Sequence, residues 1–130
     1  MRLRNVMIAL AMVLMTACAA QQAREQVLLP AMEQAWVGVK ADIEAGIDIL
    51  ELQNQKDGAA RARADLAEFD DVFKTGDIER LPKTKWPQLA NLANQGIAMR
   101  VVLGEIGAGV AKSKVERLRL FHNAIVEVLR

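Results

Sequence analysis

Four segments of the chain carry apolar residues at alternating spacings of three and four, which places them along one side of an α-helix. These segments cover about residues 30–55, 59–74, 87–107 and 113–130. An apolar side of this kind must be buried against another element, and mostly short connections favour antiparallel neighbours. We therefore predict an all-α fold, a small four-helix bundle, for residues 30–130.

The apolar stripes define the expected core. They contain Met32, Trp36, Val39, Ile43, Ile47 and Leu50; Ala59, Ala62, Leu66, Phe69 and Phe73; Leu89, Leu92, Gly96, Met99, Leu103, Ile106 and Val110; and Val115, Leu118, Phe121, Ile125 and Val128. A second stripe in the first segment contains the small residues Gly38, Ala45 and Gly46 together with Asp42, and its glycines suit close helix packing. The chain has no tyrosine, two tryptophans and three phenylalanines, so the aromatic residues that favour strands are few.

Local signals predict where the first three helices begin and end. Residues 56–58, Lys-Asp-Gly, indicate a break between the first two helices. Thr75 and Gly76 are typical of a helix end, because glycine adopts the left-handed conformation that follows many helices. Pro87 is typical of a helix start. The charged segment 77–86 between these signals is the longest expected connection.

The last two helices are harder to separate. Gly104, Gly107 and Gly109 each weaken a helix by about 1 kcal/mol relative to alanine. Residues 113–116, Ser-Lys-Val-Glu, match a capping box, and we therefore expect a turn between Gly107 and Ser113 and a fourth helix that begins at Ser113. The alternative is a three-helix bundle with a long C-terminal helix that continues through the glycines.

The N-terminus has the pattern of a secretory signal. Arg2 and Arg4 precede an apolar run at residues 6–15, and small residues follow. The strongly apolar part is too short for a transmembrane helix, which needs about 20 residues. This pattern predicts export of the chain from the cytoplasm.

The only cysteine, Cys18, refines this prediction. Residues 14–18, Leu-Met-Thr-Ala-Cys, resemble the lipobox of bacterial lipoproteins, with Met15 in place of the usual leucine. The resemblance implies cleavage between Ala17 and Cys18, a diacylglycerol on the Cys18 sulfur, and an acyl chain such as palmitate on the new amino group. It further implies a lipid-anchored protein on the periplasmic face of the outer membrane, because Ala19 rather than aspartate follows the cysteine. The alternative is a plain signal peptide cleaved near Ala20.

We therefore divide the chain into a lipoprotein signal peptide at 1–17, a lipidated cysteine with a spacer at 18–29, and a bundle at 30–130. Cleavage removes Arg2 and Arg4, which lowers the basic residues from 17 to 15 against 16 acidic ones. Nucleic-acid binding needs a strongly basic surface, so we expect no nucleic-acid partner.

The sequence offers no convincing set of catalytic, metal or cofactor residues. The segment 104–113, GEIGAGVAKS, differs from a phosphate-binding loop, because the lysine and serine come two residues late and a helix precedes them. The only histidine, His122, has no partner ligands for zinc. A haem-binding four-helix bundle would need Met32 and His122 as its two axial ligands, but we expect these residues to lie at different levels along the bundle axis. We expect a protein that is not an enzyme and that has no metal or cofactor.

Three interpretations of function remain, one of them favoured. The favoured one is a periplasmic lipid-anchored module with a structural or protein-interaction role, whose partner is an envelope protein of unknown identity. Trp86 with Lys83 and Lys85 is the proposed contact surface, because exposed aromatic residues concentrate binding energy. The alternative is a bundle that carries a small apolar ligand or cofactor. A phage-encoded or lysis-associated envelope lipoprotein is less favoured than both.

Overall fold

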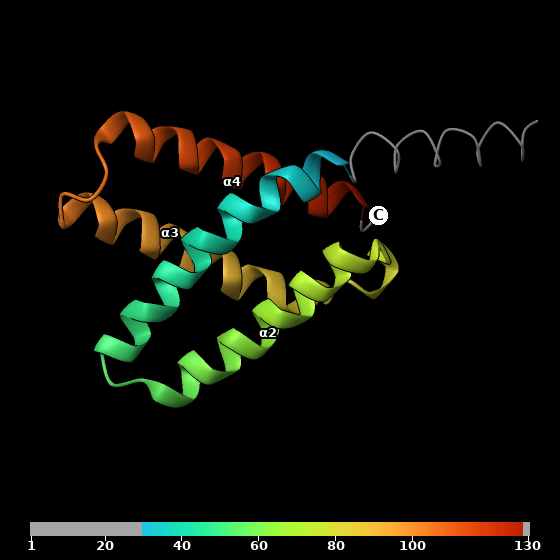
Figure 1. Cartoon of the computed structure of the whole chain (residues 1–130), viewed down its shortest axis with the longest axis horizontal. Coiled ribbons are helices and arrows are strands. Elements are labelled where there is room, and N and C mark those ends of the chain that lie inside the picture. The colour runs from blue at the N-terminus through green and yellow to red at the C-terminus, as the bar shows by residue number, and fades with distance from the viewer. Residues whose placement is uncertain (1–29, 129–130) are drawn as a thin grey trace, which may run out of the picture.

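The computed structural model describes residues 30–128, and every regular element in that range is helical (Figure 1). The elements are the first helix at residues 30–52, α2 at Lys56–Thr75, the short 3-10 turns η1 at Ile78–Arg80 and η2 at Lys83–Lys85, α3 at Trp86–Val102, and α4 at Ala108–Val128. The predicted all-α four-helix bundle is confirmed. The three-helix alternative is wrong, because residues 103–107 interrupt the helix between α3 and α4.

The helices form two antiparallel hairpins. The first helix pairs with α2, and α3 pairs with α4 (Figure 1). Both hairpin turns lie at the same end of the bundle, where the two hairpins spread apart, and the connection from α2 to α3 lies at the opposite end (Figure 1). No helix in the described range is both long and apolar enough to cross a membrane.

Three residues in the left-handed conformation end the first three helices. Gly76, with φ of 75°, follows α2 as predicted, and its N–H donates to the carbonyl oxygen of Val72. Gly104, with φ of 73°, follows α3. Asn54, with φ of 61°, follows the first helix, so the break lies at residues 53–55 and the prediction of 56–58 was wrong. Asparagine is one of the few residues besides glycine that adopt this conformation readily.

The predicted start of α4 was also wrong. The helix begins at Ala108, and Ser113 lies inside it as an exposed residue rather than as a cap. The carbonyl oxygen of Gly107 accepts a hydrogen bond from the N–H of Ala111, which makes Gly107 the boundary residue. The helical hydrogen bonds of the first turn therefore outweigh the low helix propensity of Gly109.

The aromatic side chains gather where α2 passes into α3. Trp36 stacks against Phe69 and Phe121, with ring centroids 5.9 and 5.8 Å apart. The Trp86 ring lies 5.1 Å from Phe121, and Phe73 lies 5.0 Å from Trp36. Each of the four helices contributes at least one ring, so this cluster joins the two hairpins.

The predicted stripes of the first two helices are largely buried, but the third is buried only in its first half. Leu89, Leu92 and Gly96 are buried, whereas Met99 is 36% exposed and Leu103 is 63% exposed. Val110 and Val115 at the start of α4 are also exposed, contrary to the predicted stripes. The spreading of the hairpins explains the difference, since the turn between α3 and α4 extends beyond the region where the helices meet.

Glycines bring the first helix and α3 into backbone contact. A Cβ atom on Gly46 would lie 2.6 Å from the carbonyl carbon of Leu92, and one on Gly96 would lie 2.7 Å from the backbone nitrogen of Gly46. Real Cβ atoms essentially never approach other atoms this closely. The predicted role in close packing is therefore confirmed for Gly46, and Gly96 takes part in the same contact.

Candidate functional site

The expectation of an exposed Trp86 was wrong. Its side chain is only 2% exposed, because it packs in the aromatic cluster. Its indole N–H donates a hydrogen bond of 2.9 Å to Nδ1 of His122. Lys83 and Lys85 border this region at the surface, so the three residues do not form one exposed contact surface. Trp86 belongs to the core.

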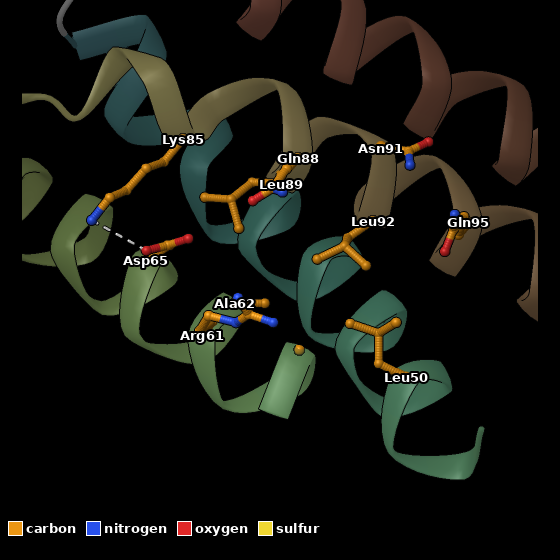
Figure 2. Close-up of a pocket in the computed structure, with 11 residues that line it drawn as sticks. Leu50, Arg61, Ala62, Asp65, Lys85, Gln88, Leu89, Asn91, Leu92 and Gln95 are labelled. Carbon is orange, nitrogen blue, oxygen red and sulfur yellow. Dashed lines mark ion pairs between the residues drawn. The ribbon is translucent and has the colours of Figure 1, made fainter. Parts of the chain in front are cut away.

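A cleft of about 540 Å³ lies between α2 and α3, beside the end of the first helix (Figure 2). Its volume falls within the range of ligand sites. The residues that line it are Leu50, Gly58, Arg61, Ala62, Asp65, Lys85, Gln88, Leu89, Asn91, Leu92 and Gln95. We take this cleft as the candidate site and refer to it below as the α2–α3 cleft.

Local sequence explains why the cleft is open. On α2, Gly58 has no side chain and Ala62 has only a methyl group, whereas larger side chains at these positions would fill the space between α2 and α3. On the other side, Gly46 and Gly96 hold α3 against the backbone of the first helix. Because that contact fixes the position of α3, α2 diverges from α3 at the end of the bundle away from the aromatic cluster (Figure 1).

The cleft has an apolar base and a polar rim. Leu89 and Ala62 are buried at its base, and Leu92 and Leu50 lie beside them (Figure 2). Gln88, Asn91 and Gln95 line the α3 side at spacings of three and four, which places them along one face of the helix. None of these three carboxamides has a side-chain hydrogen-bond partner within the described residues. Their donors and acceptors are therefore available to a ligand.

Two cations line the cleft, and they differ in their pairing. Nζ of Lys85 lies 2.8 Å from a carboxylate oxygen of Glu68. It also lies 3.3 Å from a carboxylate oxygen of Asp65, and Figure 2 shows this ion pair. The hydrogen bond to Glu68, followed by that to Asp65, raises the pKa of Lys85 above its ordinary value. Arg61, by contrast, has no carboxylate partner in the described part of the chain. The Arg61 guanidinium is thus the one charged group lining the cleft that forms no ion pair among the described residues.

A second cluster of charges lies on the other side of the bundle, around Asp42 of the first helix. This carboxylate is completely buried, and its oxygens lie 3.0 Å from Lys114 Nζ and 3.1 Å from a terminal nitrogen of Arg117, both on α4. Arg100 of α3 approaches to 3.7 Å. A side chain at Gly38 would overlap the Arg117 guanidinium, so glycine at this position makes room for the ion pair. The cluster joins the first helix to the hairpin of α3 and α4, which is a structural role.

The structure excludes a phosphate-binding loop at residues 104–113 and shows the surroundings of His122. Residues 104–113 cross from a turn into α4 after a helix, whereas a phosphate loop follows a strand. His122 is exposed and accepts a hydrogen bond from Trp86, whereas Met32 is buried in the core. Within residues 30–128, no group of three or more histidine, cysteine, aspartate or glutamate side chains is arranged to hold a metal ion.

Neither Cys18 nor the cleavage position at Ala17 lies within the described residues, so the lipid anchor remains a prediction from the sequence. No protein-family model, curated protein or solved structure matches the chain.

Sequence analysis did not identify the cleft residues as a site. No role was predicted from the sequence for Arg61 or for the carboxamides of α3. A signal was nevertheless present, because Gln88, Asn91 and Gln95 repeat the spacing of the buried Leu89, Leu92 and Gly96 one residue earlier. A stripe of amides beside the apolar stripe indicates a polar border to the helix contact, but not that the neighbouring helix diverges there.

Proposed function

We propose that the protein is a lipid-anchored helical module that faces the periplasm from the outer membrane and acts by binding an envelope partner rather than by catalysis. The anchor is attached at Cys18, and the bundle is the binding part. The observation that carries the binding role is the α2–α3 cleft, whose rim holds unpaired polar groups above an apolar base.

The lipobox-like residues 14–18 support the anchor, and the spacer supports its geometry. Fully extended, the eleven residues from 19 to 29 reach about 36 Å. The bundle would therefore stay within a few nanometres of the membrane, where tethering raises its effective concentration toward other envelope components.

The composition of the cleft favours a polar partner over an apolar ligand. Arg61, Asp65 and Lys85 carry charges on its walls, and burying them against an apolar molecule would cost free energy without new hydrogen bonds. The end of the bundle with the aromatic cluster is filled by its own rings. The apolar-carrier alternative is therefore the weaker of the two.

The anchor is tested by Cys18→Ser with Thr16→Ser as the matched control. Serine offers no thiol, so Cys18→Ser is expected to lose labelling by an alkyne fatty acid and to leave the membrane fraction. Thr16→Ser retains the cysteine and is expected to be labelled like the wild type. Equal labelling of both variants would contradict the lipoprotein proposal.

The binding role is tested by a photo-crosslinking side chain placed at Gln95 in the cleft, with Gln34 on the first helix as the control position. Both residues are exposed, so neither substitution is expected to disturb the core. We expect a discrete cross-linked product from position 95 in living cells and none from position 34. The same products from both positions would show that the cleft does not select a partner.

A further inference from the structure

The chemistry of the α2–α3 cleft narrows the class of partner. Four kinds of group line it: one guanidinium without an ion pair, the ion pair of Lys85 and Asp65, a row of carboxamides and an apolar base. The ion pair is already satisfied, so the other three kinds suit a ligand with a negative charge, hydrogen-bond donors and acceptors, and some apolar surface.

The charge of the cleft sets the charge of the ligand. Asp65 and Glu68 both pair with Lys85, so this end of the cleft carries one excess negative charge. Arg61 carries the balancing positive charge and has no carboxylate within ion-pair distance among the described residues. A guanidinium binds a carboxylate through parallel N–H donors, and the nearby carboxylates of Asp65 and Glu68 favour this singly charged group over a doubly charged phosphate.

The row of amides matches a peptide backbone. A carboxamide presents both donors and an acceptor, as a peptide bond does. From Gln88 to Gln95 the helix rises about 10 Å, which is close to the length of three extended residues. The cleft lining includes no aromatic ring on which a sugar or a nucleobase could stack. A simple anion would engage Arg61 but would leave the amides and the leucines unused.

We propose that the α2–α3 cleft binds a short extended peptide segment with a free carboxylate. The carboxylate of the peptide pairs with Arg61, and an apolar side chain of the peptide contacts Leu92 and Leu50. The peptide's backbone amides form hydrogen bonds with the carboxamides of Gln88, Asn91 and Gln95. This proposal rests on the binding role of the bundle, but it does not require the lipid anchor.

The test uses the full chain in detergent micelles and two mixtures of N-acetylated tripeptides randomised at every position. One mixture ends in free carboxylates, and the other ends in carboxamides. Nitrogen-15 NMR follows the side-chain resonances of Arg61, Asn91 and Gln95 during titration. We expect the carboxylate mixture to shift all three resonances and the amidated mixture to bind about tenfold more weakly, since a hydrogen bond to a charged group is lost.

Arg61→Gln and Arg63→Gln form the matched pair of variants. Both arginines are exposed on α2, but Arg63 points to Glu51 and Asp48 instead of lining the cleft. We expect Arg61→Gln to abolish the preference for the carboxylate mixture and Arg63→Gln to retain it.

Three results would overturn the proposal. They are no shift of the resonances with either mixture, equal binding of the two mixtures by the wild type, or sodium acetate that displaces the probe and binds as tightly as the carboxylate mixture. The last result would assign the cleft to simple anions. Because none of these measurements depends on the membrane, failure of the lipid anchor would be seen separately in the labelling of Cys18.

Discussion

Replacing Gly46 with alanine tests the close crossing of the first helix and α3. The added methyl group would overlap the carbonyl oxygen of Leu92 and lie 2.6 Å from its carbonyl carbon. The obstacle is backbone on a well-formed helix, so no side-chain rotation can relieve it. The two helices must move apart by about 1 Å, and a gap of that size forfeits a quarter to a half of each dispersion contact along the crossing.

Two effects of opposite sign determine the size of the change. Alanine stabilises a helix interior by about 1 kcal/mol relative to glycine. Overpacking a core costs about 1–3 kcal/mol and occasionally more, and the backbone obstacle places Gly46 in the upper part of that range. We expect the free energy of unfolding to fall by about 1–2 kcal/mol, which corresponds to a decrease in Tm of about 4–16 °C for a domain of this size.

Thermal unfolding followed by far-ultraviolet circular dichroism measures this change, with Gly109→Ala as the control. Gly109 also lies in a helix, but a Cβ atom there would meet nothing within 4 Å. The control is expected to raise stability by up to about 1 kcal/mol, because only the helix propensity changes. A Tm for Gly46→Ala that rises as much as that of Gly109→Ala would refute the backbone contact.

Three further predictions concern buried polar groups and the aromatic cluster. Asp42→Asn leaves three cations around a buried site without their carboxylate, so the free energy of unfolding measured in urea should fall by about 3–5 kcal/mol. Asp48→Asn at the surface is the control and should lower it by less than about 1 kcal/mol. The hydrogen bond from the Trp36 indole N–H lowers the pKa of Asp70 below its ordinary value of 3.8. The contribution of ionised Asp70 to the free energy of unfolding is therefore complete above pH 3.8 and is lost as the pH falls through the lowered pKa. Asp70→Asn should flatten the acid limb of a stability–pH curve. In a Trp36→Phe background, Trp86 should show blue-shifted emission that iodide hardly quenches, and an exposed emission spectrum would contradict its place in the core.

The helices and most of the core follow from local sequence. Spacings of three and four predicted the buried sides of the first helix and α2, because residues at these spacings share one face of any α-helix. Gly76 predicted the end of α2, since few other residues adopt the left-handed conformation at low cost. The start of α4 escaped prediction because a capping-box sequence also fits inside a helix, where Ser113 is simply exposed.

Other features depend on how far apart the helices lie, which periodicity does not report. Met99 and Leu103 continue the apolar stripe of α3, yet they lie where the hairpins have spread, so Met99 is partly exposed and Leu103 mostly exposed. Trp86 follows two lysines in a charged connection, and only the packing of all four helices shows that its ring is enclosed.

By itself, the sequence determined the helical class, the faces of each helix and the prediction of an N-terminal lipid anchor, because these depend on residues close together along the chain. Only the tertiary structure decided that Asp42 meets cations more than 50 residues away and that Arg61 borders a cleft with the amides of α3. The physical reason is that backbone contact at Gly46 and Gly96 sets the distance and angle between helices. That geometry then selects which charges become partners and which remain open to a ligand.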